Sequence, residues 1–275
     1  MKSFFEKRSI ELYVHVPLSR CKIIKRYLLE REGFCEKDNV IMILLPYRSK
    51  NQPKNLSVYA SVRDYHKYVE NLRTELIEYI KTRYPVAKIQ LFADHSPIDE
   101  VHAACISGLG FIGRNGLLIN EKYSSFVFLC EIITDLSPRE LGIEEYTEKG
   151  VRTCMNCGAC TRLCPSNCMD ESDPRPKTEC LSAITQKKGE LTDKEIEMML
   201  KNGSIWGCDV CQNECPYTKN ASFTPISYFD EGIITELDTA TLDNMSEEEF
   251  LSRPFSWRGR GVIRRNTLIY DNSKK

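Results

Sequence analysis

The chain has 275 residues, of which 41% are hydrophobic and 28% are charged, a composition typical of globular proteins. Its formal net charge is −1, so no overall basic field indicates nucleic acid, and such a partner would need a local basic patch. No apolar run approaches the roughly 20 residues that span a bilayer. The first segment also carries charges where a signal peptide would be apolar. We therefore expect a cytoplasmic protein that does not enter a membrane.

The first 150 residues alternate predicted strands and helices. The run at 39–47 is continuously apolar, as in a strand buried on both faces. The alternation favours a mostly parallel or mixed sheet covered by helices, in an α/β (α+β) domain spanning residues 1–150. Strands are expected at 9–18, 39–47 and 87–94, helices at 19–34, 61–85 and 100–111, and two further strands around a turn within 115–136.

The composition changes after residue 150, where cysteine, proline, asparagine and glycine rise and long apolar runs vanish. A region so poor in core residues needs another source of stability, and bound metal would supply it. Residues 191–204 predict a helix with Thr192 as its N-cap and Gly203 just past its end. We predict a second domain at 151–221 and an irregular tail at 222–275 that packs on the preceding domains.

Nine of the thirteen cysteines fall between Cys154 and Cys215. Without an export signal the reducing cytosol makes disulfides the weaker explanation, and clustering favours metal. The stretch CMNCGACTRLCP, residues 154–165, has the cysteine spacing of bacterial ferredoxins. In that spacing three thiolates bind one iron–sulfur cluster and the fourth binds its neighbour. A second group, CDVCQNECP at 208–216, repeats the last three members of the pattern.

This cross-over rule predicts two [4Fe–4S] clusters in a ferredoxin-like domain, with Cys180 supplying the missing member of the second group. Zinc is disfavoured, because four-cysteine zinc sites usually show two CxxC pairs. Cys168 is left over, either as a buried bystander, which we favour, or as a competitor of Cys180. The first cluster takes Cys154, Cys157, Cys160 and Cys215, and the second takes Cys180, Cys208, Cys211 and Cys164.

Clusters of this kind mostly carry electrons to chemistry done elsewhere, so a redox site is expected within the first 150 residues. Together the two halves resemble the epoxyqueuosine reductase family, in order over most of residues 10–270. The resemblance implies a cobalamin-binding domain like that of reductive dehalogenases, followed by a ferredoxin module. It also implies an oxidoreductase that removes the epoxide oxygen of epoxyqueuosine in tRNA to give queuosine. The resemblance is carried by the segments 108–136, 179–191, 206–216 and 256–266 and by the cysteine layout.

The same resemblance assigns the catalytic acid of the family to Asp94, in the stretch FADHSPIDE. An aspartate acts as an acid near neutral pH only if burial or a nearby anion raises its pKa. The alternative is that Asp94 caps a helix starting near Ser96. Glu131, an acidic residue in an apolar strand, is either buried for function or turned to solvent, and the sequence leaves both open.

Cofactor-binding positions are also implied by the resemblance. The glycines would let the backbone approach a flat corrin, or they form an ordinary helix end and turn. His66, beside one of these positions, would face the cofactor or simply lie on the surface of its helix. The implied cofactor-binding residues are Tyr65, Gly108, Gly110, Gly113, Arg114 and Asn115.

The tail carries a basic patch that includes an aromatic residue, which suits phosphate contact and base stacking on a single-stranded loop. We expect the tRNA anticodon loop carrying epoxyqueuosine as one partner and an electron-donor protein as another. Family members often carry a C-terminal helical-repeat domain, and this sequence resembles a short form without it. The alternative for the patch is a solvated helix start. The patch consists of Trp257, Arg258, Arg260, Arg264 and Arg265.

The sequence also leaves two alternative functions open. The first is a related corrinoid iron–sulfur reductase with another substrate, for which an arginine-rich tail would be unnecessary. The second is a non-enzymatic two-cluster electron carrier, for which a 150-residue α/β domain would be unnecessary.

Overall fold

The computed structural model describes residues 1–148, 153–169 and 179–274. The chain divides into two compact units. The first comprises Met1–Pro46 and Tyr65–Met155, and the second comprises Tyr47–Asp64 and Asn156–Lys275. One stretch of the N-terminal half therefore belongs to the second unit. The domains predicted at 1–150, 151–221 and 222–275 remain a prediction.

The first unit contains a four-stranded sheet in the order β1–β2–β6–β3, and every neighbouring pair is antiparallel. The expected α/β class is confirmed, but the expectation of a mostly parallel or mixed sheet is wrong. β2 and β3 do run parallel, as the intervening helix requires, but β6 is inserted between them and pairs antiparallel with both. The strands are β1 Leu12–Pro17, β2 Asn39–Pro46, β3 Ile89–Phe92 and β6 Val127–Thr134, beside a hairpin of β4 Phe111–Ile112 and β5 Leu118–Ile119.

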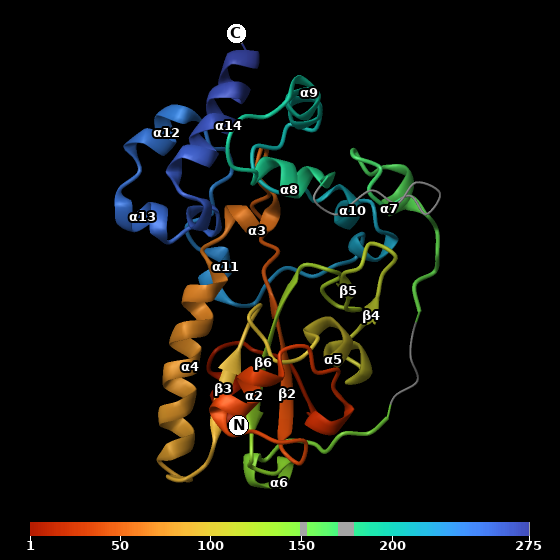
Figure 1. Ribbon diagram of the computed structural model, residues 1–275, viewed down its shortest axis with the longest axis vertical. Helices are drawn as coiled ribbons and strands as arrows, with labels where there is room; N and C mark the ends of the chain where they lie inside the picture. Colours follow the sequence, from red (N-terminus) through yellow and green to blue (C-terminus); the bar gives the residue numbers. More distant parts are fainter. Residues whose placement is uncertain (149–152, 170–178, 275) are drawn as a thin grey trace. The chain divides into compact units, whose positions relative to one another are not determined.

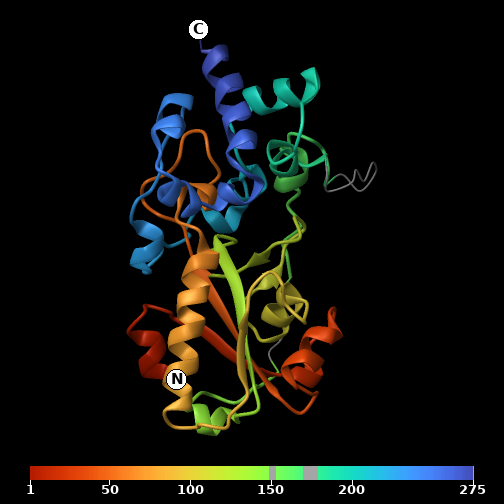
Figure 2. The ribbon, with the colours of Figure 1, turned by 60° about the vertical axis from the view of Figure 1, so that its left-hand side comes forward.

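Helices lie on both sides of this sheet (Figures 1 and 2). On one side α4, Tyr65–Lys81, buries side chains at helical spacing, among them Val69, Leu72 and Leu76. On the other side α5, Glu100–Ile106, contacts β2 and β6. No helix of the described residues is long and apolar enough to cross a membrane. The remaining helices of this unit are α1 Lys2–Glu6, α2 Arg26–Glu32 and α6 Pro138–Leu141.

Two helices begin later than expected. α2 starts at Arg26, because Ile23 forms a bridge with Ile98 and the next two backbone amides donate to the carbonyl of Pro97. α4 starts at Tyr65, because Val62 has an extended backbone that ends α3, Val58–Ser61. Loop contacts that the sequence does not reveal therefore set both boundaries.

The face of the sheet covered by α5 forms a hydrophobic core of the first unit. β2 is buried along nearly its whole length, as predicted, and contributes Val40, Met42 and Leu44 to this core. Glu131 of β6 lies in register between Met42 and Phe92 on the same face. Its side chain is therefore buried within an apolar layer, with an exposed fraction of 0%.

The second unit is built of short helices. The helix predicted around Thr192 is confirmed as α9, with a capping box between Thr192 and Glu195 and with Gly203 at φ +61° past its end. The expectation of an irregular tail is wrong, because four helices follow residue 221, two of them capped by Asp238 and Ser246. The helices are α7 Ala159–Arg162, α8 Leu181–Thr185, α9 Asp193–Lys201, α10 Val210–Asn213, α11 Ser227–Asp230, α12 Thr239–Asn244, α13 Glu247–Leu251 and α14 Arg260–Ser273.

The inserted stretch Tyr47–Asp64 helps to form the core of the second unit. Leu56 pairs with Trp206 in a parallel bridge, and both are buried with residues of α12, α13 and α14. The buried amide of Asn55 exchanges two hydrogen bonds with the backbone of Leu237, at 2.8 and 3.0 Å. The backbone N–H of Val58 donates to a carboxylate oxygen of Asp209 at 2.6 Å.

Candidate functional site

The two cysteine groups form similar local structures. α7 carries Cys160 and α10 carries Cys211, and the two short helices contact each other. Gly158, the residue before α7, has φ +73°, a conformation that favours glycine. None of the thirteen cysteines, all of which lie within the described residues, forms a disulfide. The donor set that the ferredoxin spacing requires is therefore chemically available.

Three of the ligands predicted for the second cluster lie near one another. Burial raises the pKa of Cys208 to about 12, and the charges of Cys180 and Cys164 raise it further. Like charges have this effect only over short distances, so the three thiols share one neighbourhood. No three His, Cys, Asp or Glu side chains of the described residues converge on a single metal ion. A four-iron cluster makes a different demand, because each thiolate binds its own iron atom.

Cys168, the cysteine left over by the spacing, lies beside the same neighbourhood. Its Sγ is 3.6 Å from the Sγ of Cys164. Burial raises its pKa to about 11, and the charge of Cys180 contributes to the increase. The structure therefore places Cys168 next to Cys164 and close enough to Cys180 for its charge to act on it, and its role as bystander or competitor stays a prediction.

Asp94 lies on the loop that follows β3, in an unusual backbone conformation. Its φ is +58°, the left-handed region that non-glycine residues seldom occupy and that recurs at functional sites. The alternative role as a helix cap is wrong, because α5 begins at Glu100 and Asp99 is its cap. The side chain of Asp94 is 67% exposed, and its Oδ2 is 3.2 Å from Nε2 of His66.

The pKa of Asp94 is lowered, whereas a side chain that acts alone as a catalytic acid needs a raised pKa. The hydrogen bond from His66 lowers the pKa of Asp94, and a hydrogen bond from Tyr65 lowers it further, whereas partial burial acts in the opposite direction. The raised pKa required for an acid is therefore not found, and Asp94 is a carboxylate at neutral pH. His66, expected to face the cofactor or the surface, is exposed at the surface, and it contacts this carboxylate.

Glu131, left open by the sequence, is buried beside a second carboxyl. Ser96 Oγ donates a hydrogen bond to Glu131 Oε1. Burial raises the pKa of Glu131 well above its usual range, and the charge of Glu100 raises it further. Burial also raises the pKa of Glu100, to about 7. Glu100 Oε1 in turn accepts the backbone N–H of Asp94 at 3.3 Å. Glu100 lies in the stretch FADHSPIDE, but no sequence pattern indicated a role for it.

The implied cofactor-binding glycines have local structural reasons. A Cβ on Gly110 would lie 2.5 Å from the carbonyl oxygen of Ile119 across the β4–β5 hairpin. A Cβ on Gly113 would lie 2.5 Å from Oδ1 of Asn115. Gly108, at φ +79°, follows the end of α5. These close approaches are made by the chain itself, so the contacts with cobalamin implied for the glycines stay a prediction.

Tyr65, Arg114 and Asn115 complete the implied cofactor-binding set. Tyr65 is the first residue of α4 and stacks on Phe128 with ring centroids 4.2 Å apart and an interplanar angle of 10°. The Oδ1 atom of Asn115 accepts the backbone N–H of Leu117 at 3.3 Å, which stabilises the turn of the hairpin. The contacts of these residues with a cofactor also stay a prediction.

The basic tail patch is only partly available to a partner. Arg264 forms two hydrogen bonds with Asp243, at 2.8 and 2.9 Å. Arg260 donates to the carbonyl of Leu242, and Arg265 donates to the carbonyl of Lys187. In contrast Trp257 is 61% exposed, and the guanidinium of Arg258 lies 3.8 Å from the centroid of its ring. Trp257 and Arg258 are the members that best suit base stacking.

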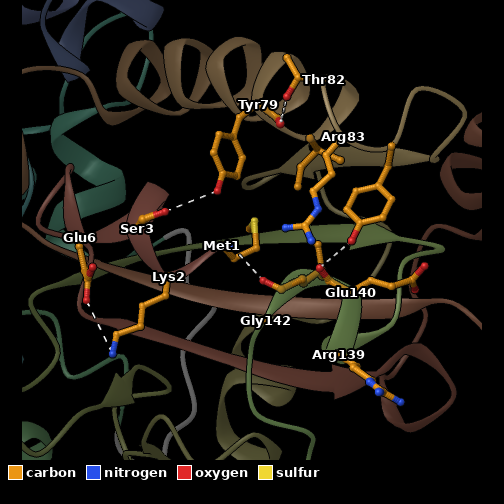
Figure 3. Close-up of a pocket in the computed structure, with 13 residues that line it drawn as sticks. Met1, Lys2, Ser3, Glu6, Tyr79, Thr82, Arg83, Arg139, Glu140 and Gly142 are labelled. Carbon is orange, nitrogen blue, oxygen red and sulfur yellow. Dashed lines mark hydrogen bonds and ion pairs between the residues drawn. The ribbon is translucent and has the colours of Figure 1, made fainter.

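A cavity of about 750 Å³ lies in the first unit, away from the residues that the sequence singled out. Figure 3 shows side chains from α1, from the end of α4 and from α6 around it, including Tyr79, Arg83 and Arg139. The amino group of Met1 donates to the carbonyl of Leu141 at its wall. None of the site residues predicted from the sequence lines this cavity.

Comparison with known proteins gives matches to two family models. Residues 153–218 match a model described as a 4Fe-4S double cluster binding domain. Residues 31–95, which include Asp94, match a model described as epoxyqueuosine reductase QueG, DUF1730.

Several curated relatives of the chain are named epoxyqueuosine reductase. An epoxyqueuosine reductase from Lactococcus garvieae is 32% identical over 74% of this chain and 58% of its own length. Another from Listeria monocytogenes is 29% identical over 86% of this chain and 64% of its own length. The chain thus spans about three fifths of the length of these relatives.

Solved structures show the same fold. Epoxyqueuosine reductase from Streptococcus thermophilus superposes with a TM-score of 0.76 at 22% identity, over 98% of this chain and 79% of that one. A structure of an epoxyqueuosine reductase with an epoxyqueuosine-modified tRNA-Tyr stem loop has a TM-score of 0.73 at 20% identity, over 98% and 80%. A third, from Bacillus subtilis, has a TM-score of 0.72 at 21% identity over the same shares, and is described with a catalytic aspartate loop swung out of the active site.

Proposed function

We propose that the chain, which matches the epoxyqueuosine reductase family model at residues 31–95 and is similar to curated members of that family, reduces the epoxide of epoxyqueuosine in tRNA to queuosine. The overall reaction takes two electrons and two protons, breaks both C–O bonds of the epoxide, forms a C=C bond and releases water. The electrons require a redox relay, and one of the protons requires a group beside the departing oxygen.

The observation that carries the proposal is the Asp94 site. Asp94 lies within the matched segment, in a strained left-handed turn, and is hydrogen-bonded to His66. Strain of this kind persists only where the surrounding structure imposes it. A tRNA stem loop is bound by one structural neighbour, and a catalytic aspartate loop is described in another. Both features support an active site at Asp94 that acts on tRNA.

We assign the proton for the departing oxygen to the hydrogen-bonded His66–Asp94 pair. The pKa of Asp94 is lowered chiefly by His66, so the carboxylate alone has no proton to give at neutral pH. An imidazole 3.2 Å away can hold that proton and pass it through the hydrogen bond. In this proposal Asp94 remains the group that faces the substrate, and His66 supplies the proton to Asp94.

Two [4Fe–4S] clusters would supply the electrons. The donor chemistry fits, because the cysteines of the matched double-cluster segment form no disulfides, and three of them share one neighbourhood. We propose the ligand sets given by the cross-over rule, with Cys154, Cys157, Cys160 and Cys215 on one cluster and Cys164, Cys180, Cys208 and Cys211 on the other.

The proposal of cobalamin rests on the resemblance to the family alone. The glycines Gly110 and Gly113 do not add support, because the atoms that approach them closely belong to the chain itself. When bound, cobalamin would supply a cobalt centre that accepts electrons from the clusters and reacts with the epoxide. We keep the implied contacts of Tyr65, Arg114 and Asn115 as part of the proposal. The tRNA anticodon loop would be met by Trp257 and Arg258, and a cytoplasmic electron-donor protein would reduce the clusters.

The test is an anaerobic assay with reconstituted protein, cobalamin, a chemical reductant and a tRNA stem loop that carries epoxyqueuosine. Mass spectrometry of the nucleosides should show queuosine with the wild type and a loss of about 10²–10⁴-fold in rate for Asp94→Asn. Asp230→Asn, on an exposed helix of the second unit, is the matched control and should keep full activity. No queuosine with the wild type rejects the proposed function, whereas full activity of Asp94→Asn rejects only the role of Asp94.

A further inference from the structure

The loop that carries Asp94 is attached to one buried carboxyl by a chain of hydrogen bonds. Glu131, on the buried face of β6, accepts from Ser96 Oγ, and that same oxygen accepts the backbone N–H of Ile98 at 3.0 Å. Glu100 lies next to Glu131 and accepts the backbone N–H of Asp94 at 3.3 Å. Glu131 and Glu100 therefore contact both sides of the Asp94 turn, residues 93–98.

The hydrogen bonds of Glu131 are incomplete unless a proton is added. Its Oε1 has a donor in Ser96, but its Oε2 is buried and has no N–H or O–H partner in the part of the chain that the structure describes. A buried carboxylate oxygen without a donor is costly. The neighbour of Glu131 is another carboxyl, Glu100, so the two can hydrogen-bond to each other only when one of them carries a proton.

We propose that Glu100 and Glu131, the glutamate pair, hold one proton between them and that this shared proton keeps the Asp94 turn in its left-handed conformation. With the proton, one carboxyl donates to the other, and both remain able to accept from Ser96 and from Asp94 N–H. Without it, two carboxylates face each other in an apolar layer and repel. The two glutamates are thus positioning residues for Asp94.

The surroundings of the glutamate pair favour the shared proton. Burial and mutual repulsion raise the pKa of Glu131 far above the usual range, and burial raises that of Glu100 to about 7. The negative charge of Asp94 acts on both in the same direction. Lys25 is the cation that acts on Glu100, and it lowers that pKa only as the last of the contributions. The other titratable groups near the pair are the buried thiols Cys21 and Cys130 and, through Asp94, His66.

The decisive variant is Glu131→Gln. The amide oxygen can still accept from Ser96, and the amide NH₂ donates permanently to Glu100, so the variant copies the protonated pair without a proton to lose. Glu78→Gln, on the exposed side of α4, is the matched control.

The test is amide hydrogen exchange of residues 93–98 in the full-length, cluster-reconstituted protein from pH 6 to pH 9, corrected for intrinsic exchange. In the wild type and in Glu78→Gln, exchange should accelerate by about tenfold per pH unit once the shared proton is lost. In Glu131→Gln it should change by less than about threefold over the same range. An equal acceleration in Glu131→Gln overturns the proposal.

A second measurement needs no folded variant. Infrared difference spectra of the wild type should show the C=O band of a protonated carboxylic acid at pH 7, and its absence overturns the proposal. Neither measurement uses tRNA or cobalamin, so a failure here is distinct from a failure of the proposed function. The importance of the turn for catalysis rests on that function, whereas the shared proton does not.

Discussion

The contact between His66 and Asp94 has a consequence that can be measured. Since the hydrogen bond from His66 is the largest cause of the lowered pKa of Asp94, His66→Gln should raise that pKa toward its usual range. Carboxyl-carbon NMR of labelled aspartate measures this directly. His102→Gln, on α5, is the control and should leave the pKa of Asp94 unchanged. An unchanged pKa in His66→Gln would show that another group holds the charge of Asp94.

The glutamate pair also makes the stability of the first unit depend on pH. A carboxyl with a raised folded pKa binds its proton more tightly in the folded state, so its contribution is full below the usual value of 4.5 and falls as pH rises through the folded value. The wild type should therefore lose unfolding free energy from about pH 4.5 through pH 7 and beyond, by about 1.4 kcal/mol per pH unit for each proton.

Glu131→Gln should lose less stability over this range, because one titrating group is removed and the other gains a donor. Native-state hydrogen exchange of the β6 amides at pH 5 and pH 8 gives the comparison, with Glu78→Gln expected to follow the wild type. The idea fails if Glu131→Gln and the wild type lose the same free energy between these two pH values.

At the scale of the element, the β4–β5 hairpin depends on Gly110. A Cβ at this position would lie 2.5 Å from the carbonyl oxygen of Ile119, and backbone cannot yield as a flexible side chain can. Gly110→Ala should destabilise the first unit by about 1–3 kcal/mol, measured by urea unfolding. Gly261→Ala is the matched control, because Gly261 lies in α14 with open space around it, and this change should stabilise by roughly 0.5–1 kcal/mol. Equal stability of Gly110→Ala and the wild type would refute the steric role.

Periodicity predicted the elements well where local signals suffice. The buried strand β2, the long helix α4 and the capped helix around Thr192 follow from apolar spacing and from the end signals Thr192 and Gly203. The order of the strands in the sheet could not be predicted from periodicity. β6 lies between β2 and β3 although it follows both of them in the sequence. The helices α11, α12 and α13 were missed because they have only four to six residues, too few for a periodic pattern.

The candidate site likewise contains residues that the sequence indicated and residues that only the structure revealed. Cysteine spacing alone indicated the clusters, and the family resemblance indicated Asp94. The partners of Asp94 come from separate places in the sequence, with His66 on α4 and Glu100 on α5, and their protonation depends on burial that a linear sequence does not display. Glu131 illustrates the point, since its role is set by Met42 and Phe92 on neighbouring strands.

At the scale of the whole molecule, the inserted stretch Tyr47–Asp64 makes neighbouring residues in the sequence belong to different units. Leu45 is buried in β2 of the first unit, and Leu56 is buried against Trp206 in the second. Leu45→Ala should therefore lower hydrogen-exchange protection in the sheet, and Leu56→Ala should lower it in α12 and α14, each by about 2–5 kcal/mol. Loss of protection in the sheet alone for both variants would contradict the division.

The bridge between Leu56 and Trp206 also has a consequence during protein synthesis. Trp206 leaves the ribosome 150 residues after Leu56. At about 5–20 residues per second, the inserted stretch waits roughly 8–30 s for its partners. Throughout that interval the apolar side chains of Leu56 and Ala60 lack the core that later covers them. The nascent chain is therefore expected to need chaperone protection at this stretch, long before any iron can be inserted.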